Sequence, residues 1–284
     1  MQHPLELRAP FDFSQTLAFM RRFPAVRDAC LITDTSVTAA ITLDGEAVPF
    51  TLRAARGGGV VVDAPADARV VACARDFIGA RDDLAPFYAA AAGDAAFQPI
   101  VGALHGLHHV RFLTLEEIAV YCVLMQRTPI TLAARMKQKF LARFGRAVRA
   151  SGEVVLRAMP DMAELGALEV DAIAAALGHP RKAAMIVDVV RGVAALGEAF
   201  LRTAPYAVAR DALLAIRGVG PFSAAAILLR GLGRMDELPW LPAFDDAGRA
   251  VYGSSFSRAA VERRYGRHIG YWAFYAKTGV ARGR

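Results

Sequence analysis

The stretch Gly218-Val219-Gly220-Pro221 interrupts a run whose apolar spacing is helical on both sides, over residues 213–216 and 224–229. Glycine adopts positive φ without steric cost and lets another backbone approach closely, and proline suits the first turn of a helix. The stretch therefore predicts two short helices joined by a tight turn. The unpaired N–H groups at the start of the second helix form a site for a phosphate oxygen. A plain αα-hairpin without a ligand fits the same four residues.

The rest of the chain divides into two parts of different pattern. Up to about residue 65, short β-branched or alternating runs such as SVTAAITL and GVVVDA are separated by the turn signals LDGE and RGGG. The amphipathic segments FSQTLAFMRRF and ADARVVACARDFIG flank these runs, and from LTLEEIAVYCVLMQ onward the period is close to 3.6. We predict an α+β domain over 1–80, a small antiparallel sheet with two helices. An all-α bundle follows over 81–284 and contains the hairpin at about 210–232.

Charge is unevenly spread between the two parts. Residues 1–110 carry 9 Lys/Arg against 12 Asp/Glu, a net −3, whereas residues 111–284 carry 25 against 15, a net +10. A polyanion is therefore expected to meet the helical part, and phosphate attraction of this kind is salt-dependent.

Composition indicates a reducing, aqueous compartment. Hydrophobic residues make up 55% of the chain, but no window approaches the roughly 18 apolar residues of a membrane span. The start MQHPLELRAPFDF has no secretory or transit pattern. Cys30, Cys73 and Cys122 lie far apart, which predicts free thiols with neither disulfides nor a cysteine metal site. We expect a cytoplasmic protein.

The hairpin stretch and its surroundings resemble the helix-hairpin-helix superfamily of DNA glycosylases. The resemblance includes an aspartate a little over twenty residues past the hairpin, Asp246, and the segment LGHPRKAAMIVDVVRGVA before it. It covers nearly the whole chain, most strongly residues 113–254. The order of the two parts is similar to the branch that removes alkylated purines, typified by bacterial 3-methyladenine DNA glycosylase II. The resemblance assigns the DNA-binding hairpin to Gly218, Val219, Gly220, Phe222 and Ser223.

Asp246 is the candidate catalytic residue. Cutting an N-glycosidic bond leaves an oxocarbenium-like sugar, which a fixed carboxylate stabilises and which water then attacks. Asp245 or Asp246 could instead cap the helix that follows, the commonest role of an aspartate there. The hairpin spacing favours catalysis by Asp246 and leaves capping or support to Asp245.

Phe222 occupies the position at which the relatives that also nick the strand carry a lysine for a Schiff base. We therefore predict a monofunctional enzyme that leaves an abasic site. Phe222 is also a candidate for the base pocket, because an aromatic face attracts a cationic base. The other pocket candidates are Tyr271, Trp272 and His268. Ala226 stands where the alkylpurine branch often has an aromatic residue.

The resemblance implies a loop that fills the gap left by an extruded nucleotide, with Gln126 and Arg127 at its tip. It implies no cofactor and no metal other than a monovalent ion on the hairpin carbonyls of Ile216 and Gly218. The expected partner is double-stranded DNA that contains damaged bases. We expect the protein to bind it as a monomer, in the cytoplasm of a bacterium, on the nucleoid.

The sequence thus predicts a DNA glycosylase of base excision repair acting on an alkylated purine. Two alternatives stay open: a glycosylase for oxidised or deaminated bases, and a catalytically silent DNA-binding module.

Overall fold

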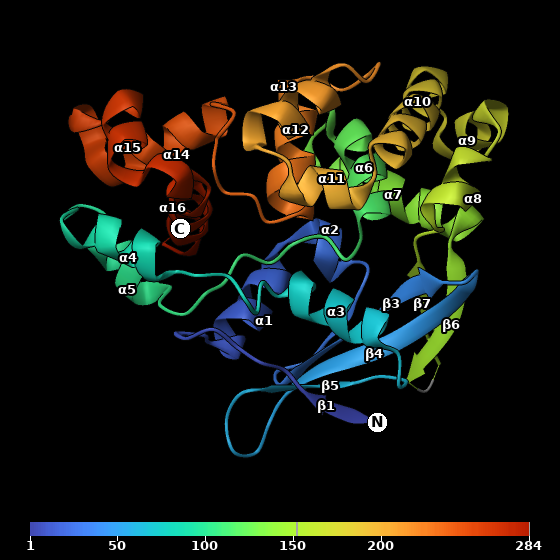
Figure 1. The fold of residues 1–284 in the computed structure, drawn as a ribbon, viewed down its shortest axis with the longest axis horizontal. Coiled ribbons are helices and arrows are strands. Elements are labelled where there is room, and N and C mark those ends of the chain that lie inside the picture. Colours follow the sequence, from blue (N-terminus) through green and yellow to red (C-terminus); the bar gives the residue numbers. More distant parts are fainter. Residues whose placement is uncertain (152, 284) are drawn as a thin grey trace.

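The computed structural model describes residues 1–151 and 153–283, and its N-terminal part is built on an antiparallel sheet (Figure 1). The strand order is β1-β5-β4-β3-β2, with every neighbouring pair antiparallel. The strands are β1 (Gln2–Pro4), β2 (Leu31–Ile32), β3 (Ser36–Leu43), β4 (Glu46–Ala54) and β5 (Val60–Asp63). Alternate residues of β3, among them Val37, Ala39 and Ile41, are buried, as the period of two predicts.

Helices cover the buried face of this sheet. They are α1 (Phe13–Arg22), the short α2 (Pro24–Arg27) and α3 (Ala68–Phe77). Asp12 caps α1 by accepting from the backbone N–H of Ser14 at 2.8 Å, and Asp67 caps α3 by accepting from Arg69 at the same distance. The two caps fix where the helices begin, so that Leu17, Met20 and Val70 pack on the sheet.

The helical part contains two separate hydrophobic cores. The first core is formed by α6 (Leu115–Met125), α7 (Ile130–Phe144), α8 (Met162–Gly166), α9 (Val170–Leu177), α10 (Pro180–Leu196), α11 (Glu198–Thr203), α12 (Tyr206–Leu214), α13 (Pro221–Ala226) and the π-helix η1 (Ile227–Gly231). We call these elements the hairpin lobe. The second core joins α4 (Ala85–Ala92) and α5 (Gln98–Ala103) to α14 (Pro242–Tyr252), η2 (Gly253–Ser255), α15 (Arg258–Tyr265), η3 (Gly266–His268) and α16 (Ile269–Arg282). We call these elements the C-terminal lobe.

The prediction of an all-α bundle was wrong over residues 146–158. Strands β6 (Arg146–Ser151) and β7 (Val154–Ala158) form an antiparallel hairpin that contacts β3 and β4. Val148 lies opposite Leu156 in register, and Leu156 packs with Ala40 of the N-terminal sheet. Residues 146–158 are therefore strands rather than helix, because burial of Leu156 and Ala158 against the sheet outweighs the local pattern.

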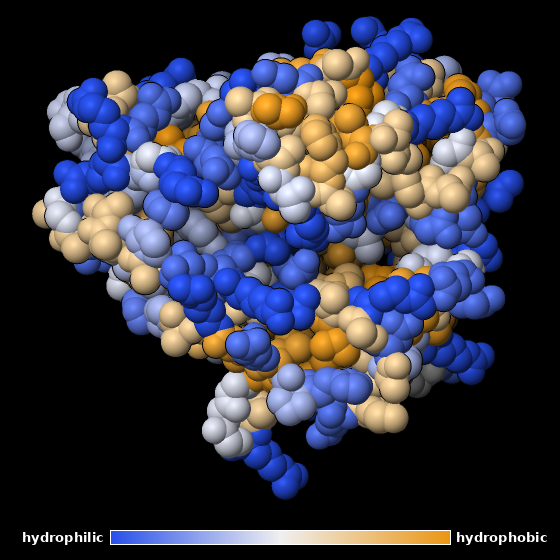
Figure 2. Space-filling model, viewed as in Figure 1, coloured by the Kyte–Doolittle hydropathy of each residue, from blue (hydrophilic) through white to orange (hydrophobic). Residues whose placement is uncertain are grey.

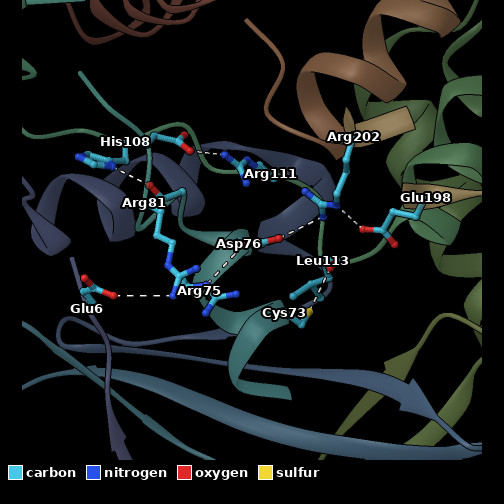
Figure 3. Close-up of polar contacts among 12 residues, drawn as sticks. Glu6, Cys73, Arg75, Asp76, Arg81, His108, Arg111, Leu113, Glu198 and Arg202 are labelled. Carbon is cyan, nitrogen blue, oxygen red and sulfur yellow. Dashed lines mark hydrogen bonds and ion pairs between the residues drawn. The ribbon is translucent and has the colours of Figure 1, made fainter. Parts of the chain in front are cut away.

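Specific polar contacts hold the N-terminal part against the hairpin lobe (Figure 3). Arg202 of α11 contacts both Asp76 of α3 at 3.1 Å and Glu198 of its own helix at 2.6 Å. The Cys73 thiol of α3 donates to the carbonyl of Leu113, just before α6, at 3.1 Å. These contacts tie α3 to the hairpin lobe on one side of the molecule.

Exposed apolar side chains of the described residues occur in small groups on several elements, among them α7, β7 and α12. On the face shown in Figure 2, apolar atoms gather over α12, where Val208 and Leu214 are exposed. Single exposed apolar residues are normal on soluble domains. Within the two described ranges, no helix is both long and apolar enough to cross a bilayer.

Candidate functional site

The glycine-rich turn joins the two short helices α12 and α13, which are separated by the six residues 215–220. Gly218 has φ 90°, a conformation that strains any residue with a Cβ. Gly220 is extended and forms the N-cap of α13, and a Cβ there would meet no protein atom within 4 Å. Gly218 therefore makes the turn possible, and the space in front of Gly220 at the start of α13 is open.

The predicted loop and the predicted hairpin are in direct contact. The Gln126 side-chain amide donates to the carbonyl of Gly218 at 2.8 Å and to the Ser223 hydroxyl at 3.1 Å. Gln126 is the C-cap residue of α6, so these bonds fix the end of α6 against the turn. Arg127 follows with its side chain exposed and with φ 50°. A left-handed non-glycine residue costs about 1–2 kcal/mol and persists only where its surroundings hold it.

Lys182 of α10 stabilises the loop that contains Gln126 and Arg127. Its ammonium group donates to the carbonyls of Val123, Leu124 and Gln126 at 2.8–2.9 Å. These are carbonyls at the C-terminal end of α6, where a positive charge is favourable. Burial lowers the pKa of Lys182, and no ion pair to this lysine is formed by a carboxylate of the described residues. Lys182 thus replaces missing helix bonds and fixes the loop that carries Arg127.

Replacing Lys182 with methionine is expected to lower the free energy of unfolding by about 1–3 kcal/mol, because three carbonyls lose a charged donor. Chemical denaturation with wild-type protein as reference measures the change. Arg181→Met is the matched control, since Arg181 is the exposed neighbour on the same helix. Equal stability of the two variants would contradict a bracing role for Lys182.

Asp246 and its neighbour Asp245 have different environments on α14. Asp246 is 68% exposed, and its only ion pair among the described residues is with Arg249 at 3.0 Å. Asp245 is buried and forms a two-pronged ion pair with Arg258 of α15, whose hydrogen bonds hold its pKa below the usual range. Neither aspartate caps α14, because the N-cap is Leu241 and has no side-chain bond. The capping alternative thus describes neither residue, and Asp245 supports the packing of α14 on α15.

Asp246 and the hairpin lie on different lobes. In Figure 1, α13 and the start of α14 both lie at the upper end of the molecule, with the connecting segment 232–241 between them. No hydrogen bond or ion pair of the described residues links Asp246 to the turn. A ligand that touches both would therefore have to span the two lobes.

Two of the predicted pocket residues are core residues. Trp272 is completely buried and donates from its indole nitrogen to the Tyr252 hydroxyl at 2.9 Å. Tyr271 is 4% exposed and donates to Asp82 at 2.7 Å. Neither has surface free to touch a base, so we leave both out of the proposed pocket. The physical reason is that this face of α16 packs on α4 and α14.

The remaining pocket candidates are more accessible. Phe222 is half-buried on α13 and belongs to none of the hydrophobic clusters of the described residues. His268 is half-buried at the N-cap of α16, and its pKa is lowered, first by burial and then by Arg267. Of the four residues predicted to form the base pocket, Phe222 is therefore the aromatic residue most accessible to a base.

Two cations in contact with aromatic rings escaped sequence reasoning. The Lys277 ammonium lies 5.1 Å from the ring centre of Phe244. The Arg230 guanidinium lies 4.5 Å from the ring centre of Phe23. The single lysine in the otherwise apolar C-terminal segment YWAFYAKTGV is a signal that could have identified Lys277.

The two carbonyls proposed for a monovalent ion are already engaged. The Val219 N–H donates to the carbonyl of Ile216 at 3.0 Å, and Gln126 donates to that of Gly218. Each oxygen therefore has one lone pair left, a poor fit for an ion that these two carbonyls alone would hold. We derive no step through such an ion.

Comparison with known proteins places this fold among the DNA glycosylases. No family model and no curated protein matches the sequence. The structure is similar to 3-methyladenine DNA glycosylase from Archaeoglobus fulgidus, with a TM-score of 0.79 and 19% identity over 98% of this chain and 97% of that one. It is also similar to 8-oxoguanine glycosylase/lyase from Clostridium acetobutylicum in complex with double-stranded DNA (TM-score 0.73, 14% identity, 96% and 92% covered). A third similar structure is DNA-3-methyladenine glycosidase from Bacillus halodurans (TM-score 0.57, 17% identity, 69% and 89% covered).

The fold is thus the one seen in these solved DNA glycosylases, which agrees with the resemblance seen in the sequence. The chain is similar in fold to both 3-methyladenine and 8-oxoguanine enzymes. At these sequence identities the likeness concerns architecture only.

Proposed function

We propose that this protein is a monofunctional DNA glycosylase that releases a damaged base from double-stranded DNA and leaves an abasic site. The observation that carries the proposal is the carboxylate of Asp246, which is exposed on one lobe of a glycosylase fold while the other lobe carries the braced hairpin. An aspartate with no capping role and no buried partner is available for a ligand.

Duplex DNA is the proposed partner, bound by a monomer through its phosphate backbone. The net +10 of residues 111–284 supplies long-range attraction. The start of α13, kept open by Gly220, offers N–H groups to one phosphate. We expect a DNA strand bound through this phosphate to run from the hairpin lobe to the C-terminal lobe.

Extrusion of the damaged nucleotide costs a few kcal/mol of stacking and pairing. Arg127 is the proposed wedge, because its backbone is fixed in a left-handed conformation while its side chain is exposed. Gln126 supports it through the bonds to Gly218 and Ser223 rather than by entering the duplex itself.

At the sugar, Asp246 is proposed to stabilise positive charge on C1′ as the N-glycosidic bond breaks. The same carboxylate orients a water molecule and accepts its proton as the water oxygen bonds to C1′. The departing base takes the bonding electron pair; a neutral base also takes up a proton from solvent, whereas a cationic base leaves as the neutral form. Arg249, at 3.0 Å from Asp246, restricts the rotation of the carboxylate.

Phe222 cannot form a Schiff base, so reaction with borohydride is expected to trap no covalent protein–DNA adduct. The measurement is incubation with a duplex containing one damaged base, with and without borohydride, followed by denaturing electrophoresis. A glycosylase/lyase serves as positive control. Base release with an intact strand supports the proposal, and a trapped adduct contradicts the monofunctional assignment.

A further inference from the structure

The exposed face of α14 carries two charged side chains among small ones. Asp246 and Arg249 are exposed, and the other exposed residues of this helix are Pro242, Ala243 and Ala250. These positions recur every three or four residues and therefore share one helical face. On this face, α14 itself presents only proline and alanine beside the charged pair, so its own side chains leave the pair open to a DNA strand.

Among the described residues, Arg249 and Asp246 form an ion pair only with each other. Arg249 Nη2 donates to Asp246 Oδ1 at 3.0 Å, and the two side chains are 60% and 68% exposed. The neighbouring carboxylate, that of Asp245, is buried in its two-pronged ion pair with Arg258. Arg249 thus has one carboxylate partner, and that partner is the proposed catalytic residue.

This ion pair opposes the reaction proposed for Asp246. The guanidinium cancels much of the negative charge that the carboxylate would present to a third group, and it repels a cationic sugar at C1′. A pair between two exposed side chains is also weak, so little free energy is needed to separate it. The carboxylate of Asp246 is therefore most effective when Arg249 has another partner.

A DNA phosphate is the partner that the proposed reaction brings to this helix. Every sugar within a DNA strand is flanked by two phosphates, so a carboxylate that reaches C1′ brings the side chain beside it close to one of them. A guanidinium binds phosphate oxygens through two parallel hydrogen bonds, which adds both strength and geometric specificity. Near such a phosphate, exchange of Asp246 for a phosphate oxygen is favourable for Arg249.

We propose that Arg249 binds a phosphate that flanks the damaged nucleotide, and that it leaves Asp246 when it does so. The inference rests on the proposed glycosylase function and assigns a DNA-binding residue to its site. In the free protein the ion pair masks the carboxylate of Asp246, and bound DNA unmasks it. Binding of the damaged strand is thus coupled to release of the catalytic charge.

The first test measures duplex affinity at a series of KCl concentrations. The probe is a duplex with one tetrahydrofuran residue in place of the damaged nucleotide, which keeps both flanking phosphates and has no base to lose. Wild type is compared with Arg249→Met and Arg249→Lys. Arg56→Met is the matched control, because Arg56 is exposed in the loop between β4 and β5, and this loop lies at the end of the molecule away from α14 (Figure 1).

Arg249→Met is expected to lower the affinity about tenfold, as loss of one charged hydrogen-bond donor implies. It should also reduce the slope of log affinity against log salt by about one, as loss of one phosphate contact implies. Arg249→Lys keeps the charge and should keep most of the slope, while losing part of the affinity. Arg56→Met should change neither quantity. If Arg249→Met changes slope and affinity no more than Arg56→Met does, the inference is overturned.

The second test asks whether Arg249 leaves Asp246 on DNA. Asp246→Asn is combined with Arg249→Met, and wild type, both single variants and the double variant are measured on the same duplex. If the partner is exchanged, the gain in affinity from Asp246→Asn is about two- to fivefold larger with Arg249 present than with methionine there, because only then must binding break an ion pair. If the ion pair persists on DNA, the larger gain occurs with methionine, where the carboxylate is uncompensated. Equal gains or this reversed order refute the exchange.

The same proteins separate this inference from the function on which it rests. Base release from duplexes that contain one damaged base is measured in parallel. If wild type releases no base while Arg249→Met lowers the slope as expected, the glycosylase function is refuted and the phosphate contact stands. If wild type releases base while Arg249→Met binds like Arg56→Met, the glycosylase function stands and the role of Arg249 is refuted.

Discussion

Asp246→Asn is expected to reduce the single-turnover rate of base release by about 10²–10³-fold, the usual cost of removing one preorganised electrostatic group. Asparagine has nearly the same shape but carries no charge, so it cannot stabilise a cationic sugar or take a proton from water. Duplex affinity should stay equal or rise slightly, because a negative charge near phosphates is removed. Release of free base from a damaged duplex, measured beside binding, checks both expectations.

Asp245→Asn is the matched control for Asp246. Its carboxylate pairs with Arg258 and packs between α14 and α15, so its loss should lower stability more than the rate per folded molecule. Asp246 is exposed, so its substitution should leave the unfolding midpoint nearly unchanged. Full activity of Asp246→Asn would refute the catalytic assignment. If wild type binds DNA but releases nothing, the silent DNA-binding module is the correct interpretation.

Lys137→Met is expected to lower the free energy of unfolding by about 3–5 kcal/mol, because it leaves a buried carboxylate without its partner. Lys137 of α7 is 1% exposed, forms an ion pair with Glu117 of α6, and donates to the carbonyl of Ala25 at 2.7 Å. The pair therefore joins α6, α7 and the segment around α2. Urea denaturation of folded wild type and variant measures the difference.

The double variant Glu117→Leu/Lys137→Met is the informative comparison. When both charges are replaced by apolar groups, no uncompensated charge stays buried, and stability should recover by several kcal/mol relative to Lys137→Met alone. Equal stability of the single and double variants would mean that the lost bond to Ala25, rather than the unpaired buried charge of Glu117, causes the effect.

Local patterns of the sequence predicted several elements well, because the responsible interactions lie within a few residues. The alternation of Ser36–Leu43 became β3, and the Asp-Gly pair after it became a tight turn with positive φ at Asp44 and Gly45. Gly218 likewise takes the positive φ of the turn after α12, and Pro221 begins α13. A local conformational preference of glycine or proline acts regardless of what packs around it.

The spacing of apolar residues predicted the structure less well where packing against distant segments decides between helix and strand, or between core and surface. Residues 146–158 form a β-hairpin because Leu156 and Ala158 bury against Ala40 of a sheet more than a hundred residues away. Trp272 and Lys277 lie on the same helix, α16, yet Trp272 is a core residue whereas Lys277 is exposed over the ring of Phe244. Which side of that helix faces α14 depends on partners that no local window contains.

The sequence by itself determined the glycine turn, the position of an acid after it and the basic charge of the helical part, since these depend on residue type and spacing alone. The tertiary structure decided how those features meet: Lys182 and Gln126 fix the loop beside the turn, and Arg258 engages Asp245 while Asp246 stays exposed. The physical reason is that hydrogen bonds and ion pairs between distant segments form only after the hydrophobic cores have set the helices in place.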